Sequence, residues 1–357
     1  MNEVSKIMVS EHSVLEVLST PPTIPYGVRM IGAPEEWRET QGQGVRVAVL
    51  DTGRPNHPDL RVVESVDFTN THVDDRNGHA THVCGSIAAD GRIKGVAPKC
   101  DLFALKVLRD FDGGTFEMTI NGIRWCIANK MDVINLSLSA GLQVSEAMHQ
   151  AIRDAHAAGI VIVAAAGNAG TPIPPQTSRI GIPASYPECI ATVAVDIERR
   201  RPEFSSVGAE ADLAAAGVEI HSTHLNGQYA RLSGTSMACP HIAGAAALMI
   251  AKARIRSKPV SSDMIRYAMQ IYADDLGTPG RDDLHGFGVF SFDRFQQTRL
   301  QFRTGQTQYF KNGIAQTAHI APRLIENRTM VGLRDVGEAF DCEVNWTPPD
   351  NIEIIKR

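Results

Sequence analysis

The stretch "NGHATHVCG", residues 77–85, places His79 and His82 three residues apart, with Cys84 two residues further on. Residues of these types serve metal binding, thiol chemistry or proton transfer by a histidine base. A helical zinc site typically uses HExxH with its glutamate and a third ligand, and "HATHV" has neither that spacing nor the acid. The pattern therefore favours a proton-transfer histidine over a metal ligand.

A second stretch, "LSGTSMACPHIAGAAALMIAKA" at residues 232–253, places Ser236 just before an alanine-rich helix. We expect Pro240 in the first turn of that helix, where its missing N–H costs nothing. A hydroxyl at a helix N-terminus lies among unpaired N–H groups and the positive end of the dipole, which stabilise a developing anion. The alternative is an ordinary N-cap serine.

The elements that must position these residues follow a regular alternation. Four short apolar runs, at 45–50, 102–108, 132–138 and 160–166, are typical of strands buried on both faces. The segments between them are long enough to cross over as helices; one begins after the predicted N-cap Ser145 and ends at Gly159. The sequence predicts an α/β fold: a doubly wound, mostly parallel sheet with flanking helices.

Polar residues follow three of these strands directly. They are Asp51 after the first, Ser139 after the third and Asn168 after the fourth. Each alone is a common turn former. Because the carboxyl ends of parallel strands meet at one edge of the sheet, where ligands bind, the three together predict a site there.

The motifs "VAVLDTG", "NGHATHVCG", "VAAAGN" and "SGTSMACPH", in this order, resemble those of the subtilisin-like serine proteases, the subtilases. The resemblance runs from Ile24 to Phe295 and implies a subtilisin-like peptidase domain over residues 23–296. It implies a serine endopeptidase that acts on polypeptide substrates through an acyl-enzyme.

Carried onto this chain, the resemblance makes Ser236 the nucleophile, His79 the general base and acid, and Asp51 the carboxylate that orients the imidazole. Asn168 becomes the side-chain donor to the oxyanion, beside the backbone N–H of Ser236. His82 is then expected to be a packed, hydrogen-bonded core residue.

The resemblance also implies a substrate cleft lined by extended backbone, with Phe116 near a distal pocket. Ser139 stands where the family usually has glycine, so its side chain is expected to narrow the pocket wall. Cys84 and Cys239 also depart from the family and are expected to pack as small hydrophobic residues, with a thiol-reagent effect through Cys84 as the alternative. The predicted substrate-binding residues are Gly113, Gly114, Phe116, Ser137, Leu138, Ser139 and Gly181.

No cofactor is required for the chemistry that the resemblance implies. Asp59 matches a carboxylate ligand of the family's main calcium site, but the loop "AADGRIKGVAP" is shortened and Pro22 occupies the usual glutamine position. Calcium binds about six to eight oxygens, and too few remain. We expect this site to be lost and predict no metal ligands, with structural calcium elsewhere left open.

Residues 1–22 resemble the short extension, or propeptide, of intracellular subtilases, which is expected to block the active site until it is cleaved. Their sequence has no secretory-signal pattern, and no apolar run reaches the about 20 residues of a membrane span. The six cysteines form no CxxC pair, which favours reduced thiols. These features predict a cytoplasmic protein.

The tail changes character, with β signals around Asn312-Gly313 and Glu326-Asn327, a short amphipathic "LRDVGEAF", and "CEVNWTPPDNIEII". Residues 300–357 resemble the copper amine oxidase N-terminal-like, or stalk, domain found in many bacterial surface proteins. With His319 and Cys342 as the soft ligands, we expect a small β-rich α+β module that docks a partner or surface rather than one that binds copper. Because this domain usually occurs in exported proteins, an extracellular or cell-surface location stays open.

The formal net charge of −5 provides no basic field for nucleic acid, so no nucleic-acid partner is expected. Two alternatives to a general endopeptidase remain. One is a catalytically inactive, subtilase-like peptide-binding protein, and the other is a processing protease of narrow specificity.

Overall fold

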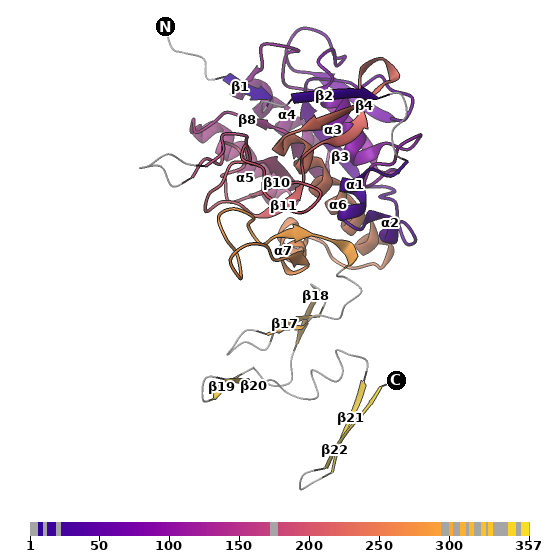
Figure 1. Ribbon diagram of the computed structural model, residues 1–357, viewed down its shortest axis with the longest axis vertical. Helices are drawn as coiled ribbons and strands as arrows, with labels where there is room; N and C mark the ends of the chain where they lie inside the picture. The colour runs from indigo at the N-terminus through magenta and orange to yellow at the C-terminus, as the bar shows by residue number, and fades with distance from the viewer. Residues whose placement is uncertain are drawn as a thin grey trace. The chain divides into compact units, whose positions relative to one another are not determined.

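The computed structural model describes residues 6–9, 13–18, 23–171 and 178–293, together with the strands between residues 300 and 356. The chain divides into two compact units, residues 1–292 and 293–357. Figure 1 shows the first unit with its strands enclosed by helices.

A nine-stranded sheet in the order β14-β15-β11-β10-β9-β7-β3-β5-β4 forms the centre of the first unit. All its pairings are parallel except that of β14 with β15. The chain adds β4 and β5 on one side of β3 and β7, β9, β10 and β11 on the other, so the winding reverses at β3. The strands are β3 (Arg46–Asp51), β4 (Val62–Asp67), β5 (Asp101–Lys106), β7 (Val133–Leu136), β9 (Val161–Ala165), β10 (Cys189–Val195), β11 (Leu213–Ala216), β14 (Ala273–Asp274) and β15 (Val289–Phe290).

Helices cover both faces of this sheet. Alternate strand residues such as Ala48 and Leu50 belong to one buried cluster with Ile123 of α4 and Ile152 of α5, as expected for side chains that alternate between faces. On the other face, α6 packs against β7, β9, β10 and β11, and α3 packs against α6. The helices are α1 (Tyr26–Met30), α2 (Ala33–Glu36), α3 (His79–Ala88), α4 (Phe116–Ala128), α5 (Glu146–Ala157), α6 (Thr235–Ile255) and α7 (Ser262–Ile271).

The predicted doubly wound, mostly parallel sheet is confirmed. The helix predicted after Ser145 is α5, and the Ser145 side chain accepts a hydrogen bond from the backbone N–H of Met148. Local signals were sufficient here because each strand is apolar throughout and each helix carries its own cap.

Two small antiparallel sheets involve the N-terminal strands β1 (Lys6–Val9) and β2 (Ser13–Leu18). In one, β1 lies between β6 (Gly114–Thr115) and β8 (Leu138–Ser139); in the other, β2 pairs with β13 (Tyr229–Ser233), which pairs with β12 (Ile220–Thr223). Figure 1 shows β1 and β2 at the upper edge of the first unit.

The helix α6 is the central helix of the first unit. Among the described helices it alone has the length and composition of a membrane span, but most of that length is buried inside the fold. Its residues are buried without a break from Thr235 to Ala251. The burial of all its faces marks α6 as a core helix.

The second unit consists, where it is described, of antiparallel strands. Lys311 pairs with Ile314 and Ile325 pairs with Arg328, so the strands that flank each predicted turn pair antiparallel. The predicted amphipathic segment "LRDVGEAF" lies outside the described residues. The strands are β16 (Leu300–Phe302), β17 (Gln308–Lys311), β18 (Ile314–Thr317), β19 (Arg323–Ile325), β20 (Arg328–Met330), β21 (Cys342–Thr347) and β22 (Asn351–Lys356).

Candidate active site

Asp51 and His79 meet at the point where the winding of the sheet reverses. Asp51 is the last residue of β3, and His79 is the first residue of α3. The imidazole Nδ1 of His79 lies 2.8 Å and 2.9 Å from the two carboxylate oxygens of Asp51. Both residues are fully buried. This contact sets the ring so that Nδ1 faces the carboxylate and Nε2 is the nitrogen that can exchange a proton with a reacting group.

The start of α3 is held by Asp75, a residue that the sequence analysis missed. Its buried carboxylate accepts five hydrogen bonds. The donors are Thr52 Oγ1 and the N–H groups of Asn77 and Gly78 on one oxygen, and the N–H and hydroxyl of Thr81 on the other. The signal in the sequence was an acidic residue just before a helix start, where unpaired N–H groups attract it.

Gly78, immediately before His79, requires a backbone that other residues avoid. Its φ is +96°, and a Cβ there would overlap the imidazole of His224. Glycine at this position therefore sets the direction in which α3, and with it His79, begins.

Ser236 lies in the first turn of α6, one residue inside the helix, and Pro240 is the sixth helical residue. The prediction that Pro240 belongs to the first turn is therefore wrong. In a regular helix the N–H of residue 240 would donate to the carbonyl of Ser236, and proline has no N–H. The hydroxyl of Ser137 takes its place and donates to that carbonyl at 2.9 Å.

Ser137 thus contacts Ser236 in two ways. The Ser236 hydroxyl donates to the Ser137 carbonyl at 3.3 Å, while the Ser137 hydroxyl is also held by the amide of Asn135 at 3.0 Å. The Cys239 thiol completes this buried group by donating to the Asn135 carbonyl oxygen at 3.2 Å. The nucleophile candidate is therefore fixed to the strand end after β7.

Asn168 is oriented by Thr235, the first residue of α6. The amide oxygen of Asn168 accepts hydrogen bonds from the backbone N–H of Thr235 at 3.0 Å and from its hydroxyl at 2.9 Å. Since both contacts use the amide oxygen, the NH₂ group is the end that can donate to a substrate.

His82 and the cysteines near the site behave as packing residues. Nε2 of His82 contacts the carbonyl oxygens of Ile220 and Ala230 at 2.9 Å and 3.2 Å, and the residue is fully buried. Burial lowers the pKa of His82 and raises the pKa of the thiols of Cys84 and Cys239. A buried neutral thiol is a poor nucleophile, which favours the packing role expected for Cys84.

The N-terminal strand β1 occupies the predicted substrate cleft. Ile7 pairs with Gly114 of β6, and Met8 and Val9 pair with Ser139 and Leu138 of β8. A Cβ on Gly113 would collide with the carbonyl oxygen of Ile7, which explains the glycine at this edge. The side chain of Ile7 is buried in the main core cluster with Leu138, and Phe116 packs against the same cluster.

Ser139 and Gly181 face each other at the end of the cleft. A Cβ on Gly181 would overlap the hydroxyl oxygen of Ser139, and that hydroxyl also accepts the N–H of Gly141 at 3.1 Å. The Gly181 N–H donates to the carbonyl of Ala166 at 2.9 Å, two residues before Asn168. The Ser139 side chain thus fills space beside the strand that leads to Asn168.

Protein groups surround Asp59, the residue that matches a calcium ligand. One carboxylate oxygen accepts the Tyr229 hydroxyl at 2.9 Å and the Ile93 N–H at 3.1 Å. Among the described residues there is no cluster of three His, Cys, Asp or Glu side chains that could hold a metal ion. The side chains of His319 and Cys342 lie outside the described residues.

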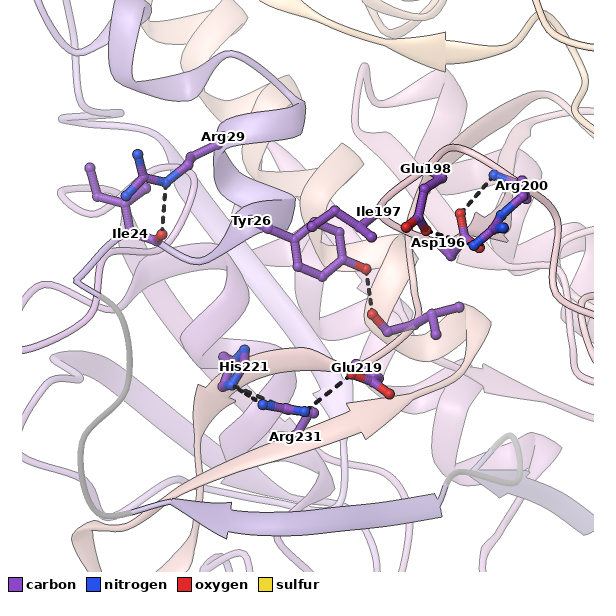
Figure 2. A pocket seen from close by; sticks show the side chains of 11 residues that line it. Ile24, Tyr26, Arg29, Asp196, Ile197, Glu198, Arg200, Glu219, His221 and Arg231 are labelled. Carbon is purple, nitrogen blue, oxygen red and sulfur yellow. Dashed lines mark hydrogen bonds and ion pairs between the residues drawn. The ribbon is translucent and has the colours of Figure 1, made fainter.

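A cavity of about 560 Å³ lies elsewhere, between α1, the loop after β10 and the β12–β13 hairpin. Figure 2 shows Arg231 contacting His221 and Glu219 on one side of it, and Tyr26 on another. None of the predicted site residues lines it. The lining residues are Ile24, Tyr26, Arg29, Asp196, Ile197, Glu198, Arg200, Val218, Glu219, His221 and Arg231.

A buried Asp–His pair, a serine at the N-terminus of a core helix and an oriented asparagine, at the carboxyl edge of a doubly wound sheet, define a serine hydrolase. The comparisons with known proteins give the family. Residues 42–288 match the Subtilase family, so the chain belongs to the subtilases. Residues 295–355 match the copper amine oxidase N-terminal domain.

The chain is similar to several bacterial subtilases. It is 42% identical over 262 residues to subtilisin DY of Bacillus licheniformis, covering 71% of this chain and 93% of that protein. It is 41% identical over 256 residues to an intracellular serine protease of Paenibacillus polymyxa, covering 68% and 78%. It is 44% identical over 238 residues to subtilisin E of Bacillus subtilis, covering 64% and 62%.

The chain is a serine endopeptidase. Its substrates are polypeptides, and its catalysis needs no cofactor. The alternatives raised by the sequence, an inactive peptide-binding protein or a narrow processing protease, are not favoured by these relatives.

Proposed function

We propose that Ser236, His79, Asp51 and Asn168 carry out the peptide hydrolysis. The observation that carries this assignment is the pair of short contacts between His79 Nδ1 and the buried Asp51 carboxylate, at the start of a helix that packs against α6. A carboxylate in this position fixes the imidazole tautomer and stabilises the imidazolium that forms during the reaction.

In this proposal the Ser236 hydroxyl leaves the Ser137 carbonyl oxygen when a substrate N–H takes that acceptor. Nε2 of His79 removes the hydroxyl proton as Ser236 Oγ attacks the scissile carbonyl carbon. The backbone N–H of Ser236 and the Asn168 amide stabilise the oxyanion, an effect commonly worth about 10²- to 10³-fold per donor. That magnitude was measured in a subtilisin and is the family's own. The leaving amine takes the proton from His79, and water then hydrolyses the acyl ester.

A fluorophosphonate probe tests these roles. A covalent adduct on Ser236 that is lost in His79→Ala supports them. If the chain without residues 1–22 forms no adduct, the inactive alternative is supported instead.

We propose that residues 1–22 hold the cleft closed until they are cut, as the pairing of β1 with β6 and β8 supports. An external substrate then binds as β1 does, with an apolar side chain in the position of Ile7. Intact-mass measurements over time test this. The active enzyme should lose N-terminal mass, Ser236→Ala should not, and an unchanged mass in both would contradict the idea.

We propose that the main calcium site of the family is replaced by hydrogen bonds to Asp59, since two protein donors already bond one of its oxygens. Excess EDTA should then leave the thermal midpoint unchanged, and a lowered midpoint that calcium restores would contradict this. Structural calcium bound elsewhere in the chain would also give a midpoint that EDTA lowers and calcium restores.

We propose a cytoplasmic location. The five cysteines of the described part that can be assessed are all unpaired and buried, which suits a reducing compartment, and one relative is named an intracellular serine protease. Residues 293–357, a compact unit, are proposed to dock a partner or surface. Fractionation of cells producing the full chain tests both, because recovery on the cell surface would favour the extracellular alternative.

A further inference from the structure

The loop that joins β5 to β6 connects the substrate cleft to the candidate active site. It begins after Lys106, the last residue of β5, and ends at Gly114, the first residue of β6. The Arg109 N–H donates to the Gly113 carbonyl at 2.9 Å and closes the loop. Gly114 pairs with Ile7 of β1, so a peptide strand occupies this wall of the cleft in the structure.

Lys106 is fully buried beside the strand end that carries Asp51. Its ammonium donates to the carbonyl of Thr52, the residue after Asp51, and to Asp110 Oδ1 at 2.7 Å. A buried ammonium requires a counter-charge, and Asp110 provides it. His72 Nε2 lies 2.9 Å from the second oxygen of Asp110. Desolvation raises the pKa of Asp110, but Lys106 and His72 lower it by more, so the net shift of this pKa is downward and favours the carboxylate.

Asp110 is also bonded to the start of α3. Its backbone carbonyl accepts a hydrogen bond from the side-chain amide of Asn77 at 2.6 Å. The amide oxygen of Asn77 in turn accepts the His79 N–H at 3.1 Å. One loop residue is therefore linked to both members of the buried acid–base pair. The carboxylate of Asp110 reaches the strand end of Asp51 through Lys106, and its carbonyl reaches the backbone of His79 through Asn77.

We propose that Asp110 is a positioning residue that couples the β6 wall of the cleft to the Asp51–His79 pair. The proposal rests on the roles assigned to His79 and Ser236. A substrate strand paired with β6 restrains that strand, and the hydrogen bond that closes the loop passes the restraint to Asp110. With Asp110 restrained, its two links hold the imidazole in line with the Ser236 hydroxyl. Binding energy from substrate residues far from the scissile bond then raises kcat rather than only lowering KM.

Two p-nitroanilides with the same residue before the scissile bond measure this coupling in the full chain. One is an acetylated tetrapeptide that reaches the Gly114 position, and the other is the acetylated single residue, which does not. The kcat is taken per active site, counted with the fluorophosphonate, and the coupling ratio is kcat for the tetrapeptide divided by kcat for the single residue. Asp110→Asn should lower this ratio by about tenfold, through the tetrapeptide alone, with little change in its KM.

Two further variants separate positioning from stability. Asp112→Asn makes the same change at an exposed residue of the same loop and should keep the wild-type ratio. Asp110→Asn leaves the Lys106 ammonium without its counter-charge, which destabilises the fold. Adding Lys106→Met removes that buried charge, so the urea midpoint should rise towards the wild-type value. The coupling ratio should stay low in this double variant, because the links from the loop to Asp51 are still missing.

A coupling ratio that is the same in Asp110→Asn and in the wild type would overturn the proposal. A ratio that recovers together with the urea midpoint in the double variant would also overturn it, because Asp110 would then act on stability alone. In both cases the fluorophosphonate still labels Ser236, so the assigned roles of the site survive. If the wild-type chain forms no adduct and hydrolyses neither anilide, the role of Ser236 is contradicted, and both proposals fail.

Discussion

At the scale of single residues, Ser139 lies in the predicted cleft, where the resemblance to the family leads us to expect glycine. Its hydroxyl fills the space opposite Gly181 and accepts the N–H of Gly141. A pocket narrowed in this way discriminates between substrate side chains by their size. One extra or missing methylene in such a side chain commonly changes kcat/KM by about 10- to 200-fold.

Ser139→Gly should raise kcat/KM for phenylalanine relative to alanine before the scissile bond by about tenfold. Peptide p-nitroanilides that differ at that residue alone measure the ratio. Ser139→Ala keeps the Cβ and separates the hydroxyl from the bulk, so its ratio should lie between the two. An unchanged ratio in Ser139→Gly would show that another wall limits the pocket.

Asp75 holds the start of α3, the helix whose first residue is His79. Asp75→Asn replaces one acceptor oxygen by an NH₂ group, so N–H donors at the start of α3 lose their acceptor, a loss of about 1–3 kcal/mol in the free energy of unfolding. We expect kcat to fall more than KM rises, because the imidazole is displaced. The control is Asp74→Asn, which removes a half-exposed pair with Arg54 and should cost at most about 1 kcal/mol. Equal effects of the two variants would refute the positioning role.

The residues that could be predicted from sequence are those that lie within specific motifs of several residues. His79 and Ser236 stand in specific patterns, and the structure places His79 on Asp51 as the resemblance implied. Asp75 could not be distinguished from Asp74 because both precede the same turn, and only the fold decides which of two adjacent carboxylates points to the helix.

At the scale of elements, a hydrogen bond to the Ser236 carbonyl joins α6 to the strand end after β7. Pro240 removes the helical donor to the Ser236 carbonyl, and the Ser137 hydroxyl replaces it at 2.9 Å. This replacement also explains why the prediction for Pro240 was wrong. The prediction assumed that a proline must lie in the first turn of a helix, where no N–H is needed. Because the Ser137 hydroxyl supplies the missing donor, proline can also occupy the second turn of α6.

Ser137→Ala should therefore destabilise the protein by about 1–3 kcal/mol, since it leaves a buried carbonyl without its donor. In a Pro240→Ala background the helix supplies an N–H, and the same change should cost less. Urea unfolding of the four chains, all carrying Ser236→Ala to prevent autolysis, measures the coupling. Additive effects would mean that the two residues do not share the carbonyl.

The helices and parallel strands could be predicted because they rest on local periodicity. The strand order could not, and neither could the pairing of Ile7 with Gly114 or of Ser13 with Ser233. These contacts join residues more than 100 positions apart, and backbone pairing leaves little trace in side-chain pattern.

At the scale of the whole molecule, buried histidines make stability depend on pH. Burial lowers the pKa of His241 to about 4 and also lowers that of His82. The unfolded chain takes up these protons below about pH 6.5, while the folded chain does not until the lower pKa is reached. Stability is therefore fully present above pH 6.5 and is lost as the pH falls towards 4.

For His241 alone this loss amounts to about 3 kcal/mol. The free energy of unfolding of Ser236→Ala, measured by urea at several values between pH 7 and pH 4.5, should fall steadily. Adding His241→Gln should flatten the curve, even if the variant is less stable at pH 7. Parallel curves would show that other groups cause the acid sensitivity.

The burial of α6 has a practical consequence for measuring this enzyme. Ser236 belongs to the first turn of a helix that is buried without a break over seventeen positions, Thr235 to Ala251, so the helix cannot loosen without exposing the core. Once the N-terminal segment is removed, the fraction of chains that react with an active-site titrant should equal the fraction that is folded. A covalent titration can then count native molecules in a refolding mixture, where spectroscopy reports only an average.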